Sequence, residues 1–133
     1  MAFTAKHRFA RIAPRKARLV MDLIRGRAVD DALAMLSFSK KRAAVLIDKV
    51  VRSAVANASE QEADTAALVV KACWVDPGPI IKRFQPKDRG KAYAIQKKMS
   101  HLVVTLDERA QKAAKAAKAE KGEKTEKAEK TAK

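Results

Sequence analysis

Residues 68–106 read LVVKACWVDPGPIIKRFQPKDRGKAYAIQKKMSHLVVTL, two β-rich segments with a long basic connection between them. The two ends of this stretch, Leu68–Val75 and Leu102–Leu106, are rich in β-branched residues. Both ends are typical of strands in one antiparallel sheet. About 26 residues connect them, which is far longer than an ordinary hairpin turn. The sequence therefore predicts a sheet from which a long hairpin extends.

The connecting segment, residues 77–101, carries seven basic residues and one acid, Asp88. Its apolar residues form no helical stripe that could be buried, so we expect an external partner to order it. Phe84 and Tyr93 offer faces on which an unpaired base can stack. Gly90 predicts a tip with positive φ. The alternative is a flexible surface loop, but long unstructured loops are uncommon in compact domains without a function.

The sequence before this stretch predicts two short helices. Pro14 suits the first turn of a helix, and Gly26 suits the position just after its end. Asp30 and Asp31 favour the start of a second helix that runs to about Leu36, because acids stabilise the positive end of the helix dipole. The apolar face of the first helix recurs at helical spacing and comprises Ala17, Val20, Met21 and Ile24.

A third, longer helix is expected from Lys40 to about Ala58, with Ser39 as its N-cap. Residues 4–12 alternate loosely and predict an edge strand. The chain is therefore predicted to be an α+β protein. The core face of the third helix comprises Ala44, Ile47, Val51, Ala54, Val55 and Ala58.

Charge is unevenly distributed along the chain, which has 30 Lys and Arg against 15 Asp and Glu and a net charge of +15. Residues 1–27 hold eight basic residues and one acid, whereas residues 28–76 are nearly neutral. A solvated surface that keeps the protein soluble is the simple interpretation. Two blocks of nearly one sign favour a nucleic acid partner instead.

The length of 133 residues suits one domain with a modest core. We expect residues 1–108 to form a single RNA-binding domain that includes the hairpin 77–101. Residues 109–133 are low in complexity, built of Ala, Lys and Glu, and predict a disordered basic tail with partial helicity as the alternative. No segment resembles a signal peptide or a membrane span. The single cysteine, Cys73, fits a reducing compartment, so a cytoplasmic protein is expected.

Candidate catalytic and metal-binding groups are few. His7 and His101 are the only histidines, and neither lies at a metal-ligand spacing. Cys73 in a β-rich run is typical of a small buried hydrophobe. Trp74 indicates packing at a domain edge, with RNA stacking as the alternative. We therefore predict no enzyme activity, cofactor, metal or small-molecule substrate.

Several short motifs, in order over about residues 5–107, resemble those of bacterial large-subunit ribosomal protein L-twenty-two. They are Lys6-His7-Arg8, Pro14-Arg15-Lys16-Ala17-Arg18-Leu19-Val20, Asp22-Leu23-Ile24-Arg25-Gly26, Lys41-Arg42-Ala43-Ala44, Ser53-Ala54-Val55-Ala56-Asn57-Ala58, Val75-Asp76, Gly78-Pro79, Lys82-Arg83-Phe84, Arg89-Gly90 and Ser100-His101. Any one of them is weak evidence, whereas this many in register make the resemblance specific.

The resemblance implies three helices packed on a small three-stranded antiparallel sheet, with a long protruding hairpin. It implies a structural constituent of the large ribosomal subunit that binds large-subunit ribosomal RNA and joins early in assembly. The globular domain would lie near the exit of the peptide tunnel, beside neighbouring ribosomal proteins. The hairpin would line the tunnel opposite ribosomal protein L-four, past the nascent peptide, where changes in the family affect macrolide sensitivity.

Charge and resemblance together give the expected site residues. The expected ribosomal RNA contacts are Lys6, His7, Arg8, Arg11, Arg15, Lys16, Arg18, Arg25, Lys82, Arg83, Phe84, Lys87, Arg89, Lys91, Lys97, Lys98 and His101. The expected tunnel-facing tip comprises Lys82, Arg83, Lys87, Asp88, Arg89, Gly90 and Lys91.

Four residues depart from the family pattern, and two of them, Gln85 and Asp88, stand where basic or small residues are more usual. Pro77 replaces a usual acid and should stiffen the base of the hairpin. Ala13 stands where a capping serine is common, which predicts a less firmly started helix. Asp88 either faces the tunnel water or pairs with Arg89.

A second function class also fits the charge and the tail, namely a free-standing DNA- or RNA-binding protein of nucleoid or regulatory type. The long hairpin between two strands favours the ribosomal interpretation, because duplex binders usually present a helix or a short ribbon.

Overall fold

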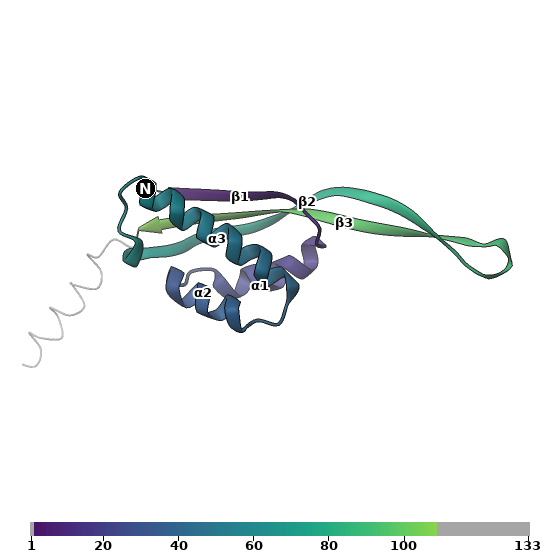
Figure 1. The fold of residues 1–133 in the computed structure, drawn as a ribbon, viewed down its shortest axis with the longest axis horizontal. Coiled ribbons are helices and arrows are strands. Elements are labelled where there is room, and N and C mark those ends of the chain that lie inside the picture. The colour runs from purple at the N-terminus through teal and green to yellow at the C-terminus, as the bar shows by residue number, and fades with distance from the viewer. Residues whose placement is uncertain (1, 109–133) are drawn as a thin grey trace, which may run out of the picture.

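The computed structural model describes residues 2–108, which form one three-stranded antiparallel sheet and three helices (Figure 1). The strand order is β1-β3-β2, and the helices cover one face of the sheet (Figure 1). The predicted α+β fold is confirmed. The elements are β1 (Ala2–Ala10), α1 (Pro14–Ile24), α2 (Val29–Phe38), α3 (Arg42–Glu60), β2 (Leu68–Pro86) and β3 (Ala92–Glu108), with 3₁₀ turns at Thr65–Ala67 and Asp88–Gly90.

Helix α1 begins at Pro14, as predicted, and its N-cap Ala13 provides no side-chain hydrogen bond. Its predicted apolar face is the buried one. Gly26 follows the helix with φ +76°, which confirms its expected role. Its N–H donates to the carbonyl of Val70 at 2.9 Å, and the Val70 N–H donates back to the carbonyl of Arg27 at 2.9 Å. These two bonds fasten the end of α1 to β2.

The predicted N-cap role of Ser39 is wrong. Ser39 instead closes α2, and its backbone N–H donates to the carbonyl of Leu36 at 3.2 Å. Helix α2 continues to Phe38, beyond the expected end, so Ser39 is already used as a C-cap. Helix α3 starts two residues later than expected, with Lys41 at its N-cap.

The core lies between the helices and the sheet. Helix α3 contributes mostly small side chains, so its backbone can approach the strands closely, and the predicted core residue Val55 is only partly buried. Val50 and Ala43 are buried as well. The inward residues of the sheet alternate with outward ones and comprise Phe3, Ala5, Leu68, Val70, Cys73, Val75, Leu102, Val104 and Leu106.

Strands β2 and β3 pair continuously from Leu68 opposite Glu108 to Pro86 opposite Ala92, apart from register shifts after Val70 and after Pro77. The predicted long hairpin is therefore a regular ribbon that projects beyond the helices (Figure 1). The second shift contains Gly78, where a Cβ would lie 3.1 Å from the carbonyl carbon of Met99. A side chain here would therefore press against the backbone of Met99 at the point where the strands leave the body.

The ribbon turns at Asp88–Gly90. Gly90 has the expected positive φ, +70°, and Arg89 also lies in the left-handed region, at +55°. The Asp88 carboxylate accepts a hydrogen bond of 3.0 Å from the backbone N–H of Arg89. The expected association of Asp88 with Arg89 is therefore a bond to the backbone amide.

The predicted tail, residues 109–133, lies outside the described residues. Among residues 2–108, no helix is long and apolar enough to cross a membrane.

Replacing Gly26 with alanine should lower the free energy of unfolding by about 1–2 kcal/mol, because an L-residue is strained in the left-handed region. A Cβ there would meet nothing within 4 Å, so the loss is conformational and not steric. Gly26→Asn is the matched control and should lose less, because asparagine tolerates this conformation. Urea unfolding measures both, and equal stability of Gly26→Ala and wild type would contradict the expectation.

Candidate nucleic-acid interface

The hairpin arm, residues 80–98, has two distinct faces. Directly paired residues in an antiparallel ribbon point to the same side, so the register assigns each residue to a face. The first face carries the pairs Ile80–Lys98, Lys82–Gln96, Phe84–Ala94 and Pro86–Ala92. The second face carries the pairs Ile81–Lys97, Arg83–Ile95 and Gln85–Tyr93.

Both faces combine cations with apolar side chains. All residues from 82 to 98 are exposed, and Phe84 and Tyr93 are 74% and 55% exposed. The Lys87 ammonium lies 5.6 Å from the centroid of the Tyr93 ring, within cation–π range. Cations can neutralise phosphates and exposed rings can stack on bases. The arm therefore exposes cations and an aromatic ring on each of its two sides.

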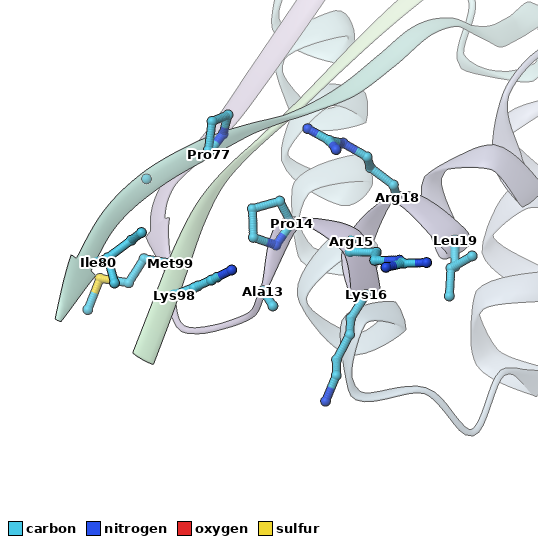
Figure 2. A pocket seen from close by; sticks show the side chains of 11 residues that line it. Ala13, Pro14, Arg15, Lys16, Arg18, Leu19, Pro77, Ile80, Lys98 and Met99 are labelled. Atoms are coloured by element: carbon cyan, nitrogen blue, oxygen red, sulfur yellow. The ribbon is translucent and has the colours of Figure 1, made fainter. Parts of the chain in front are cut away.

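Two hollows flank the base of the arm, where α1 begins. The first, of about 620 Å³, is shown in Figure 2 and is lined by Ala13, Pro14, Arg15, Lys16, Arg18, Leu19, Pro77, Gly78, Ile80, Lys98 and Met99. The second, of about 680 Å³, is lined by Arg11, Ile12, Ala13, Lys16, Arg42, Ile81, Arg83, Lys97, Lys98 and Met99. No acidic side chain lines either hollow, so both attract anions.

The hollows bring together residues from four segments far apart in sequence. They join the predicted contacts Arg11, Arg15 and Lys16 to the predicted contacts of the arm base. Arg42 also lines the second hollow, although sequence reasoning did not include it. The sequence feature that could have indicated Arg42 is the basic run Lys40-Lys41-Arg42 at the start of α3. Only the fold places Arg42 beside the arm.

Two predicted contacts in α1 and at its C-cap already have partners in β2. The Arg18 guanidinium donates to the carbonyl of Val75 at 3.2 Å. Arg25 donates to the carbonyl of Cys73 at 3.0 Å and forms an ion pair of 2.9 Å with Asp22. Both arginines therefore hold α1 against β2. A guanidinium has five donors, so each retains N–H groups for a further partner.

A bulge near the end of β1 brings together three more predicted ribosomal RNA contacts, His7, Arg8 and His101. Phe9 has φ +57°, and its N–H donates to Nδ1 of His101 at 3.0 Å. The Phe9 ring meets His101 edge-on at 4.9 Å, and the guanidinium of Arg8 lies 5.3 Å from the Phe9 centroid. His7 lies at the same register shift. Because Nδ1 accepts, neutral His101 carries its proton on Nε2, which remains a donor.

Lys6 lies apart from the hollows, on the open face of the sheet. It pairs with Val103, which also pairs with Trp74. The Trp74 indole donates to the carboxylate of Asp76 at 3.2 Å and is partly exposed. The predicted contacts therefore divide among the arm, the hollows, the bulge, this open face and, for Arg25, the contact between α1 and β2.

Nucleophilic and metal chemistry finds no support among these residues. Cys73 is buried, and its thiol donates to the carbonyl of Met21 at 3.2 Å. Burial raises the pKa of the Cys73 thiol, an effect larger than the opposing one of Arg25, so the reactive thiolate is disfavoured. Within residues 2–108, no group of three or more His, Cys, Asp or Glu could hold a metal ion.

Comparison with known proteins identifies the family of this chain. The family model described as "Ribosomal protein L22p/L17e" matches residues 5–107. A curated relative, "Large ribosomal subunit protein uL22" of Bdellovibrio bacteriovorus, is 44% identical over 110 residues, which cover 82% of this chain and 100% of the relative. The family model thus spans both the helical body and the whole arm. The chain belongs to the ribosomal protein L22p/L17e family, as its motifs predicted.

Proposed function

We propose that this protein is a constituent of the large ribosomal subunit that binds large-subunit ribosomal RNA through its arm and the two basic hollows. Members of its family are structural, non-enzymatic ribosomal proteins of the large subunit, which in bacteria is cytoplasmic. One observation supports the RNA-binding part of this proposal. Both exposed faces of the arm combine cations with apolar side chains.

The arrangement of the arm favours RNA on both sides of the ribbon. A ribbon that lay on a protein surface would need only one face for its partner. Here each face has at least two cations, such as Lys82 and Lys98 on the first and Arg83 and Lys97 on the second. Contacts of this kind recognise phosphates and RNA shape more than base sequence.

The arm also supports a role in early assembly. Beyond Ile80 its two strands pair with each other, and an isolated two-stranded ribbon is only marginally stable in water. RNA that encloses the ribbon would therefore stabilise it, so that ordering of the arm and binding are coupled. Such a protein contributes most when it joins before the surrounding RNA has closed.

The tip is proposed to line the nascent-peptide tunnel. Seven residues, Ile80–Pro86, at about 3.3 Å each carry the tip roughly 20 Å beyond the base of the arm. The tip bears Lys87, Arg89 and Lys91, and the Asp88 carboxylate is engaged by a backbone N–H. Residues 1–108 would act as one RNA-binding unit, with 109–133 as a cationic extension.

A free-standing DNA- or RNA-binding protein would behave differently in a cell lysate. We expect the tagged full-length chain to sediment with the large ribosomal subunit and to stay there after a moderate salt wash, because enclosed contacts exchange slowly. Gradient fractions probed for the tag measure this. A chain that left the large-subunit peak at moderate salt would favour the free-standing binder.

Replacing Lys82, Arg83 and Lys87 with alanine should weaken binding to single-stranded segments of ribosomal RNA and flatten its salt dependence. Each lost phosphate contact lowers the log–log slope by about 0.7, so three lost contacts lower it by about 2. Titrations at several salt concentrations measure the slope.

The matched control replaces Arg27, Lys49 and Arg52, which are exposed and neither belong to the arm nor line either hollow. It removes the same net charge and should leave the slope close to that of wild type. If both triple variants changed the slope equally, only the overall charge of the protein would matter, and the arm would not be the binding element.

A further inference from the structure

We infer that the two hollows at the base of the arm together bind one unpaired nucleotide, with the base in the first hollow and its phosphates in the second. This inference rests on the proposed RNA binding and specifies what the base of the arm recognises. It concerns single-stranded RNA, because only an unpaired nucleotide exposes both a base face and its phosphate to one protein site.

The first hollow has walls suited to a base. Pro14 and Leu19 of α1 line it together with Ile80 and Met99, and Pro14 lies on the side nearer to Ile80 and Met99 (Figure 2). Leu19 is 55% exposed and Ile80 is 47% exposed, so a planar ligand that covers either side chain would remove apolar surface from water. Arg15 also lines this hollow, and its planar guanidinium can stack on a base. The volume of the first hollow, about 620 Å³, lies within the range of about 300–1,000 Å³ typical of small-ligand sites.

The second hollow is suited to phosphates. Six cationic side chains line it, among them Arg11, Arg42 and Arg83. Arginine matches phosphate oxygens with paired donors. Six like charges around one concavity repel one another when no carboxylate is among them, and a polyanion relieves that repulsion.

The two hollows are close enough to hold parts of one nucleotide. They share the lining residues Ala13, Lys16, Lys98 and Met99, so a base in one has its phosphate beside the other. Gly78 packs closely against Met99, because a Cβ at Gly78 would lie 3.1–3.3 Å from three atoms of Met99. Met99, which lines both hollows, therefore lies at the point where β2 and β3 leave the body.

Leu19 and Leu23 provide a matched pair of variants for a test. They lie one turn apart on α1 and are 55% and 43% exposed, but only Leu19 lines the first hollow. The probes are a ten-nucleotide uridine oligomer and an abasic oligomer of equal length, in fluorescence anisotropy titrations. The full-length chain carries Phe84→Ala and Tyr93→Ala throughout, so that stacking on the arm does not mask the site.

Leu19→Ser should weaken binding of the uridine oligomer about tenfold, a typical effect of losing one stacked base, and should leave binding of the abasic oligomer unchanged. Leu23→Ser should change neither. Lys16→Ala should weaken both, because it contacts the phosphates shared by the two probes. Circular dichroism checks that each variant is folded.

Three results would overturn the inference: equal effects of Leu19→Ser and Leu23→Ser on the uridine oligomer, equal effects of Leu19→Ser on both oligomers, or displacement of the uridine oligomer by decaglutamate at matched concentration. The last would indicate an acidic protein segment as the occupant. If the parent chain bound the uridine oligomer with the expected salt dependence, these results would leave the proposed function standing. If wild type bound neither the oligomer nor ribosomal RNA, the proposed function itself would fail.

Discussion

The pairing of β2 with β3 joins the body of the protein to its arm. The same two strands form the centre and one edge of the sheet beneath the helices and then continue as the arm. Leu102, Val104 and Leu106 fix one half of the ladder in the core. The arm thus leaves the body as an extension of packed strands, and its direction is set by the core and by the close contact at Gly78.

Cations serve two different purposes in the two halves of the molecule. In the body, Arg18 and Arg25 donate to carbonyls of β2 and hold α1 on the sheet. In the arm and around its base, the cations point into solvent without a carboxylate among the lining residues of the hollows. A high net charge is tolerated because much of it lies where an anionic partner is proposed to bind, away from the apolar core.

Local signals predicted much of the fold, whereas tertiary contacts decided what the sequence could not. Pro14, Gly26 and Gly90 act through their own backbone preferences, so their roles could be read directly. Ser39 was misassigned because a short loop offers one residue to two helix ends. The bulge at Phe9, the place of Arg42 and both hollows depend on which segments meet in space, and no periodicity in the chain encodes that.

The alternation of the arm also limits how its length can vary. Side chains of a β-ribbon change sides with every residue, so a single insertion in each strand would move all residues beyond it to the opposite side. Lys82 and Phe84 would then point to the side that now carries Arg83 and Gln85, and Arg83 and Gln85 to the side that now carries Lys82 and Phe84. Homologous arms should therefore differ in length by even numbers of residues per strand, unless a compensating bulge restores the phase.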